Sequence, residues 1–195
     1  MASVPQRVRG GTTLEEFLRR KDIEDKPYLE YIDGRIEAKA FPRSKHSMIQ
    51  GRLIGVFGEH TRSGTDGDIF PKLRCTFEGR SIVPDLVFLR EENIPVDETG
   101  ELVNIVLIPP DIHIEILSPD QTARSAHEKL VHSTAHGTAL GVFIDPERKT
   151  IDIYRPNRPP ERLGDDGAID GEPVLPGFRL SVAEVFGRLV RRRPG

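Results

Sequence analysis

Two acidic residues interrupt short apolar runs of this sequence, and their charges restrict how those runs can be buried. Asp85 lies within residues 82–89, which read Ile-Val-Pro-Asp-Leu-Val-Phe-Leu, and Glu115 lies within residues 112–117, which read Ile-His-Ile-Glu-Ile-Leu. Both runs have the length and composition of buried β-strands. A carboxylate buried in such a strand must be paired, protonated or bound to a metal ion. The fold therefore has to bring compensating groups to Asp85 and Glu115.

A lysine on the next predicted helix offers one such group. Residues 122–136 have helical spacing and end at Gly137, and Lys129 lies in the middle of this helix. Two carboxylates on neighbouring strands would form a hard oxygen site that suits Mg²⁺ or Mn²⁺. The Lys129 ammonium would pair with the carboxylates, orient a water molecule or stabilise charge on a phosphate. The alternatives are that each acid belongs to a structural salt bridge and that Lys129 is a surface lysine.

Local signals near the N-terminus predict a short helix and a β-hairpin. Thr13 and Glu16 have the spacing of a capping box, in which each side chain satisfies a backbone amide of the other residue. An Asp-Gly pair at residues 33–34 separates the strand-like runs 28–32 and 35–38. Asp-Gly between two such runs favours a two-residue hairpin turn.

The rest of the chain alternates strands and helices. We expect helices at residues 44–62, 122–136 and 182–190, strands at 69–77, 82–89, 112–117, 139–144 and 151–154, and a long loop at 90–111. This order predicts an α/β fold in which a mixed sheet has helices on both sides.

Length and composition fit one globular domain. The chain has 195 residues, of which 36% are hydrophobic, so it can bury a core. We expect a flexible N-terminal segment at residues 1–11, a single domain at 12–190 and a basic tail at 191–195. The sequence shows no apolar run long enough to cross a bilayer and no secretion signal, and its single cysteine, Cys75, cannot form an internal disulfide. These features predict a cytoplasmic protein with no membrane partner.

The net charge of −3 gives no global signature of nucleic-acid binding. Basic residues cluster only locally, at 43–45, 72–74 and 188–193, and a solvated surface is the simpler interpretation of each cluster. The charge argues against a nonspecific DNA coat protein more than against an enzyme, because active-site carboxylates themselves lower the net charge.

A series of short motifs, in order along residues 12–187, resembles the Uma-two family of restriction endonucleases, a bacterial branch of the PD-(D/E)xK nuclease superfamily. The motifs are EYIDGRI at residues 30–36, a helix start at His46, VPDLVFL at 83–89, IEILSP at 114–119, Lys129, FIDP at 143–146 and LPGFRLSVAEVF at 175–186. The resemblance implies a restriction-endonuclease-like fold.

The resemblance also implies a role for each matched residue. Asp85 corresponds to the metal-binding aspartate of the PD half-motif and Glu115 to the second acidic ligand. The carbonyl of Ile116 would be a further metal ligand. The usual lysine would fall at Leu117 and is absent there, so that Lys129 on the following helix takes its place. The implied catalytic set is Asp85, Glu115 and Lys129, with the metal bound by Asp85, Glu115 and Ile116.

The chain departs from the family pattern at two places. Ser133 stands where relatives commonly have a tyrosine, and residues 141–142 are Gly-Val where relatives have a Tyr-Trp pair. We interpret these as packing positions. The sequence assigns no role to Glu30, His46 or Ser118.

The function implied by the resemblance is hydrolysis of DNA phosphodiester bonds by a magnesium-dependent endonuclease, with Mn²⁺ as a substitute. DNA would be the partner, and a homodimer is expected because one-site subunits that cut both strands favour a two-fold assembly. The alternative is a catalytically inactive nuclease-fold module that binds nucleic acid or a protein partner. A requirement for the metal would distinguish the two.

The two acids also predict an effect on stability. If Asp85 and Glu115 repel each other in the metal-free protein, Asp85→Asn should be neutral or stabilising by roughly 0–1 kcal/mol. If Asp85 is instead a partner in a buried salt bridge, the same change should cost about 3–5 kcal/mol.

Overall fold

The computed structural model describes residues 11–63, 67–119 and 121–190. Within these residues, the main sheet has six strands in the order β10-β9-β8-β7-β6-β3. The strands are β3 (Asp68–Pro71), β6 (Leu86–Leu89), β7 (Ile112–Ile116), β8 (Leu140–Asp145), β9 (Thr150–Tyr154) and β10 (Glu161–Arg162). The β7–β8 pair is parallel and its neighbouring pairs are antiparallel, so the sheet is mixed, as predicted.

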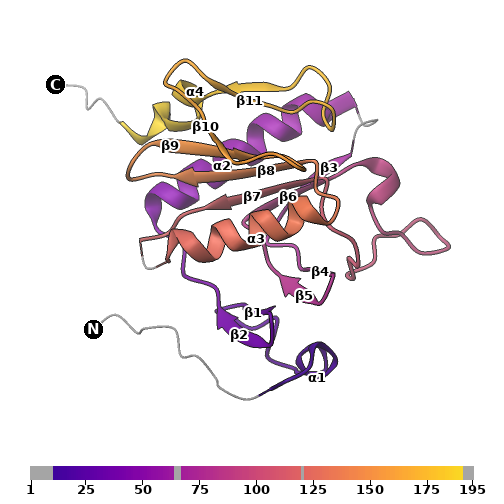
Figure 1. Ribbon diagram of the computed structural model, residues 1–195. Helices are drawn as coiled ribbons and strands as arrows, with labels where there is room; N and C mark the ends of the chain where they lie inside the picture. Colours follow the sequence, from indigo (N-terminus) through magenta and orange to yellow (C-terminus); the bar gives the residue numbers. More distant parts are fainter. Residues whose placement is uncertain (1–10, 64–66, 120, 191–195) are drawn as a thin grey trace.

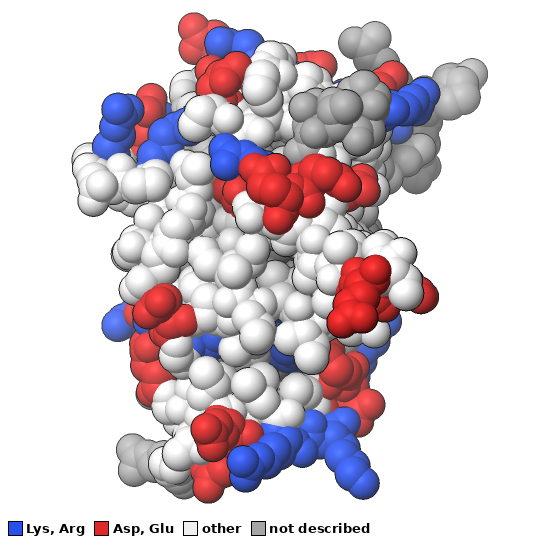
Figure 2. Space-filling view, turned by 90° about the vertical axis from the view of Figure 1, so that its right-hand side faces the viewer, with Lys and Arg blue, Asp and Glu red and all other residues white. Residues whose placement is uncertain are grey.

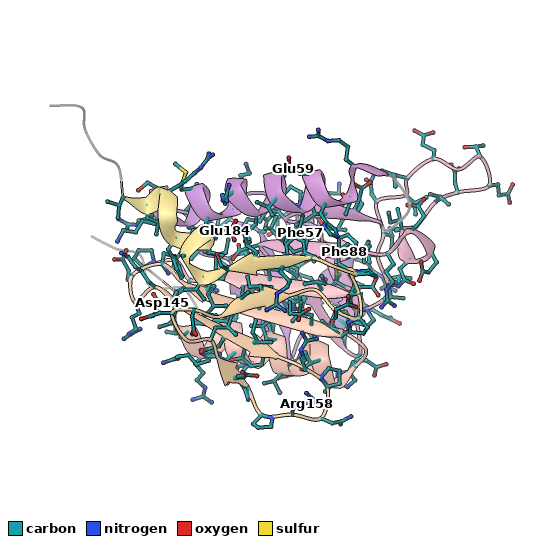
Figure 3. The ribbon with its side chains drawn as sticks, turned by 90° about the horizontal axis from the view of Figure 1, so that it is seen from above. Phe57, Glu59, Phe88, Asp145, Arg158 and Glu184 are labelled. Atoms are coloured by element: carbon teal, nitrogen blue, oxygen red, sulfur yellow. The ribbon has the colours of Figure 1, made fainter. Side chains whose placement is uncertain are left out.

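Two helices cover opposite faces of the main sheet (Figure 1). Helix α2 (Ser44–His60) packs on the face that carries the three isoleucines of β7, and helix α3 (Ala123–Ala135) packs on the other. Phe57 of α2 meets Phe88 of β6 between helix and sheet, with ring centroids 6.3 Å apart (Figure 3). Helix α3 is the crossover that a parallel β7–β8 pair requires. The expected α/β fold, with helices on both sides of the sheet, is confirmed.

A second sheet lies below the main one in Figure 1. Its order is β2-β1-β5-β4, formed by β1 (Leu29–Ile32), β2 (Arg35–Ala38), β4 (Cys75–Phe77) and β5 (Arg80–Ile82). The predicted hairpin is present as β1 and β2, and both turn residues have positive φ, 50° at Asp33 and 78° at Gly34. This combination defines the turn that Asp-Gly favours. The predicted capping box is also present at the start of α1 (Leu14–Leu18).

Two expected strands are each divided in the structure. Residues 69–77 separate into β3 and β4 at Lys72, whose φ of 54° turns the chain out of the strand direction. Residues 82–89 separate into the end of β5 and the whole of β6, because Pro84 has no amide to donate to a ladder. The expectation that Asp85 lies inside a strand was therefore wrong: it lies directly before β6, where the chain passes from one sheet to the other.

The C-terminal part adds a two-stranded sheet and a short helix to the α2 side. These are β11 (Ala168–Asp170), β12 (Arg179–Ser181) and α4 (Val182–Phe186), followed by the 3-10 turn η3 (Gly187–Leu189). The predicted last helix is thus shorter than 182–190. The predicted loop at 90–111 is present and contains one 3-10 turn, η2 (Glu91–Asn93), while η1 (Thr61–Ser63) follows α2.

The predicted tails, residues 1–11 and 191–195, lie almost wholly outside the described residues, and the domain division stays a prediction. In the parts of the chain that the structure describes, every helix is too short or too polar to span a bilayer.

Candidate active site

Asp85 is fixed by hydrogen bonds from the neighbouring strand β7 and from helix α2. Its Oδ2 accepts a hydrogen bond from the backbone amide of Ile116 at 2.7 Å, at the end of β7. The side-chain amide of Gln50, on α2, donates to the Asp85 carbonyl at 2.8 Å. These contacts hold the carboxylate beside the end of β7, and its Oδ1 is left for other partners.

Three basic side chains gather at Oδ1 of Asp85. Lys39, which follows β2, has its Nζ 3.2 Å away, and His46, in the first turn of α2, has its Nε2 at the same distance. Lys72, at the end of β3, also forms an ion pair with this oxygen. Asp85 is 1% exposed, so these basic groups provide its compensation in place of water.

Glu115 points from β7 toward α3 and is fully buried. Its Oε1 lies 2.7 Å from Nζ of Lys129 and 3.1 Å from Nε2 of His113. Its Oε2 accepts a hydrogen bond from Nζ of Lys39 at 3.1 Å. The other ring nitrogen of His113 lies 2.8 Å from Oγ of Ser133 on α3. Each Glu115 oxygen therefore has at least one basic partner.

Lys129 joins Glu115 to a third carboxylate, that of Glu30. The Lys129 Nζ donates to both oxygens of Glu30 at 3.1 Å. Oε1 of Glu30 also accepts a hydrogen bond from the Val83 amide at 2.8 Å, beside the proline that interrupts the strand. Lys129 is 0% exposed, so its interpretation as a surface lysine was wrong.

Lys39 is the group that links the two predicted metal-binding acids. Its single ammonium lies 3.2 Å from Asp85 Oδ1 and 3.1 Å from Glu115 Oε2. The two carboxylates thus converge on one position, and a cation occupies that position. The structure brings Asp85, Glu115 and Lys129 together, as the sequence predicted, but it places Lys39 between the acids.

The basic neighbours keep both acids ionised. Burial alone would raise the pKa of Asp85, but the Lys39 ammonium, His46 and the Lys72 ammonium hold it well below its usual range. Burial would likewise raise the pKa of Glu115, yet the ammonium groups of Lys129 and Lys39 lower it. Both side chains are therefore carboxylates at neutral pH, the form in which an acid binds a metal ion.

The basic groups respond differently to burial. Burial would lower the pKa of Lys39, but the carboxylates around it, Asp85 first and then Glu115, raise it above its usual range. Burial lowers the pKa of Lys72, and the neighbouring Lys39 ammonium lowers it further against the pull of Asp85. Burial also lowers the pKa of His113, which Glu115 offsets only in part. At neutral pH, Lys39 is charged and His113 is neutral.

The donor set fits Mg²⁺ or Mn²⁺ better than zinc. Oxygens of Asp85 and Glu115 already converge on a cation, and Mg²⁺ needs only one or two carboxylates because it keeps several of its waters. Across residues 11–63, 67–119 and 121–190, no three His, Cys, Asp or Glu side chains are grouped as a ready-made metal cage. A divalent ion between the acids would have to displace the Lys39 ammonium, because like charges cannot share that position.

Several site residues were not identified from the sequence. Lys39 and Lys72 lie at strand ends, where a lysine is ordinary, and nothing in their spacing singles them out. Glu30 carried a usable signal, since it is an acid inside the apolar run that begins the hairpin. His46 was noted without a role, and Ser133 was interpreted as a packing residue, whereas it is the hydrogen-bond partner of His113.

The remaining predicted site residue, Ile116, lies next to the acids. Its amide is bound to Asp85, and the role of its carbonyl as a metal ligand stays a prediction. Ser118, which follows β7, is buried at 2% exposure.

Comparisons with known proteins identify the family and support the fold. A crystal structure described as "a putative nuclease belonging to DUF820 from Anabaena variabilis" superposes with a TM-score of 0.87 and is 37% identical; the match covers 91% of this chain and 99% of that one. No curated protein matches the sequence. The model of the Uma2 family, described as "Putative restriction endonuclease", matches residues 14–183, which contain every site residue described above. The chain therefore belongs to the Uma2 family of restriction-endonuclease-like proteins.

Proposed function

We propose that this protein is a metal-dependent endonuclease that hydrolyses DNA phosphodiester bonds at the Asp85–Glu115 site. The observation that carries the proposal is the convergence of these two carboxylates on one cation, the Lys39 ammonium, in a nuclease-like fold. Mg²⁺ is the proposed cofactor and Mn²⁺ its substitute. A metal bound there would lower the pKa of a coordinated water and polarise the phosphate.

The residues around the acids would each have a separate role in binding and catalysis. Asp85, Glu115 and the Ile116 carbonyl would hold the ion. Lys129, fully buried between Glu30 and Glu115, would keep the Glu115 carboxylate in place and charged. Once displaced from between the acids, the Lys39 ammonium would be free to stabilise the negative charge that develops on the phosphate. Lys72, which is partly exposed, would contribute to the same stabilisation.

We also propose that the protein acts as a homodimer in the cytoplasm. Support comes from the loop at 90–111, which protrudes at the right of Figure 1 and exposes six large apolar side chains: Val96, Leu102, Val103, Ile105, Leu107 and Ile108. The face that carries this loop shows acidic and basic groups around a largely uncharged middle in Figure 2. Such a middle suits a protein partner better than DNA, because phosphates require basic groups.

One observation favours the alternative of an inactive binding module. Glu30, Asp85 and Glu115 carry three negative charges, and three lysines, Lys39, Lys72 and Lys129, compensate them without a metal. Because its charges are already compensated, such a site does not need a metal ion to be stable. Metal-dependent hydrolysis is therefore the property to measure.

The test is cleavage of a broad pool of genomic, methylated and single-stranded DNA with Mg²⁺ or Mn²⁺. We expect products that EDTA abolishes, and Ca²⁺ should support DNA binding without efficient cutting because it activates water poorly. Glu115→Gln should abolish cleavage. As a control, circular dichroism should show that this variant is still folded at the assay temperature. Metal-independent binding with no cleavage, alike in wild type and Glu115→Gln, would replace this proposal with the binding module.

A further inference from the structure

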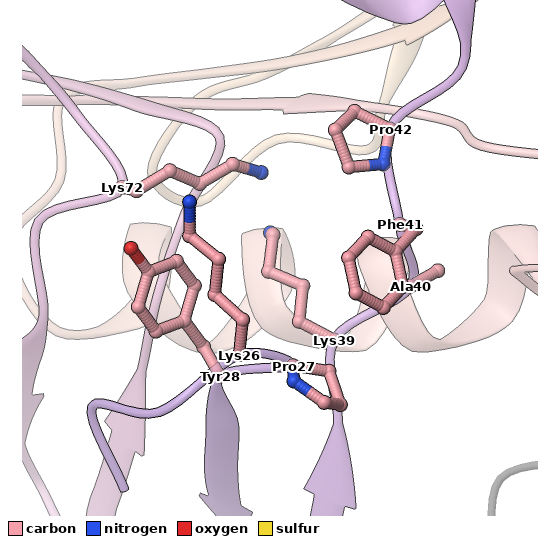
Figure 4. A pocket seen from close by; sticks show the side chains of 8 residues that line it. All are labelled: Lys26, Pro27, Tyr28, Lys39, Ala40, Phe41, Pro42 and Lys72. Carbon is pink, nitrogen blue, oxygen red and sulfur yellow. The ribbon is translucent and has the colours of Figure 1, made fainter.

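A pocket of about 170 Å³ opens beside the two acids (Figure 4). Its charged groups are three lysines, Lys26, Lys39 and Lys72, and its walls include the rings of Tyr28 and Phe41 together with two prolines. In Figure 4 the two rings stand on opposite sides of the view, with the side chains of Lys26 and Lys39 between them and that of Lys72 above.

The inner end of the pocket is the proposed active site itself. Lys39 lines the pocket, and its ammonium contacts both Asp85 and Glu115. Lys72 lines it as well and is paired with Asp85. A phosphate held by these ammonium groups would therefore lie beside the carboxylates. The third lysine, Lys26, is exposed and has no ion-pair partner among the residues that the structure describes, so its charge is available to an anion.

The outer part of the pocket is apolar and aromatic. Phe41 lies between β2 and α2, is 62% exposed and belongs to none of the core clusters of the described chain. The ring is therefore free to stack against a ligand. Bases stack on such rings with little dependence on sequence, because every base has a π-face.

The size of the pocket limits what can enter. Pockets for drug-sized ligands have volumes of about 300–1,000 Å³, so a pocket of about 170 Å³ has room for one planar ring and not for a base pair. A base within a duplex is held by stacking and pairing, and its extrusion costs a few kcal/mol. An unpaired base avoids most of this cost.

We propose that this pocket binds one unpaired nucleotide of the DNA substrate, with its base stacked on the exposed ring of Phe41 and its phosphate at the lysines. The protein would then prefer single-stranded DNA, or DNA splayed at the cleaved bond, over continuous duplex. This inference rests on the proposed nuclease function for the choice of ligand, but it concerns binding and can be measured without cleavage.

The experiment compares a labelled single-stranded oligonucleotide with a blunt duplex of the same sequence, by fluorescence anisotropy in EDTA. Wild type should bind the single strand more tightly. Phe41→Ala should weaken single-strand binding by roughly tenfold, since stacking on one ring contributes about 1–3 kcal/mol and 1.4 kcal/mol corresponds to tenfold. Its duplex binding should change less than about twofold, because a paired base does not reach the ring. Val190→Ala, the loss of another exposed apolar side chain that does not line the pocket, should change neither.

Phe41 is exposed, so Phe41→Ala should have the same melting temperature as wild type. A binding defect would therefore not reflect unfolding. Equal affinity of wild type for single strand and duplex, or unchanged single-strand binding by Phe41→Ala, would overturn the inference. Cleavage of the same oligonucleotide with Mg²⁺ is scored separately. Phe41-dependent binding without cleavage would support the nucleotide pocket and overturn the proposed hydrolysis.

Discussion

The ammonium of Lys129, carried on α3, lies 2.7 Å from Oε1 of Glu115 on β7, and both side chains are completely buried. Neither group has access to water, so the attraction between the two charges has to offset the free-energy cost of burying each of them. Removal of one charge leaves the other uncompensated. This dependence makes the site a structural element as well as a candidate for catalysis.

Lys129→Met should therefore lower the free energy of unfolding by about 3–5 kcal/mol, because Glu115 and Glu30 would lose their shared cation in a dry interior. Chemical denaturation at neutral pH measures the effect. Lys21→Met, the same change at an exposed lysine, is the control and should be neutral within about 0.5 kcal/mol. A loss of less than about 1 kcal/mol for Lys129→Met would mean that water or another group reaches Glu115.

Asp85→Asn should also destabilise the metal-free protein, which revises the expectation from the sequence. That expectation assumed uncompensated repulsion between two acids, whereas Asp85 is surrounded by the ammonium groups of Lys39 and Lys72. We now expect a loss of about 3–5 kcal/mol in EDTA. Glu59→Gln, at an exposed acid on the outer side of α2, is the matched control (Figure 3). A neutral result for Asp85→Asn would restore the repulsion argument.

Lys39→Met should tighten the binding of Mn²⁺ even though it destabilises the metal-free fold. The ammonium occupies the position between Asp85 and Glu115 that the ion would take, so its removal eliminates a competing positive charge. At protein-like dielectric constants one such charge at about 4 Å corresponds to several kcal/mol, so we expect at least about tenfold tighter binding. Isothermal titration of folded wild type and variant with Mn²⁺ measures the change. Weaker binding by Lys39→Met would place the ion elsewhere.

Stability should fall as the pH decreases from about 7 to 5, partly because of His113. Its pKa in the folded protein is lowered by burial, so below about pH 6.5 the unfolded chain takes up a proton that the folded protein does not. Each such proton costs up to about 1.4 kcal/mol per pH unit. His132, whose pKa burial lowers to about 4, acts in the same direction.

The pKa values of Asp85 and Glu115 are also lowered, so their stabilising contribution is present above about pH 4 and is lost as the pH falls through their folded values. Urea denaturation of wild type and His113→Asn at several pH values separates these contributions. The variant should show a shallower slope between pH 7 and 5. Parallel slopes would show that folding does not lower the pKa of His113.

If the loop at 90–111 forms the proposed dimer contact, Ile105→Glu should shift the protein toward monomer. Ile105 is 66% exposed, so the charge should not affect the folded subunit, but its desolvation in an apolar interface would be costly. Light scattering after size exclusion measures the mass. Val131→Glu, at an exposed apolar residue of α3, is the control. A monomeric wild type would contradict the dimer directly.

Much of this protein could be predicted from local sequence, because local features depend on neighbours in the chain. The capping box at Thr13, the hairpin turn at Asp33 and the strand around Glu115 are fixed by turn chemistry and by alternation, and all are present. The exceptions follow the same logic. The strand break before Asp85 is caused by Pro84, and the sequence contained that signal.

The family motifs placed Asp85, Glu115 and Lys129 in one candidate site, but only the tertiary structure decided what surrounds them. The partners of the two acids are distant in sequence: Lys39 is separated from Glu115 by 76 positions, and Lys129 from Glu30 by 99. Lysines at strand ends are usually solvated, and the sequence around Lys39 does not differ from that around a surface lysine. It is the meeting of the hairpin, α2, α3 and the strand ends that excludes water there, and the absence of water forces these charges to pair.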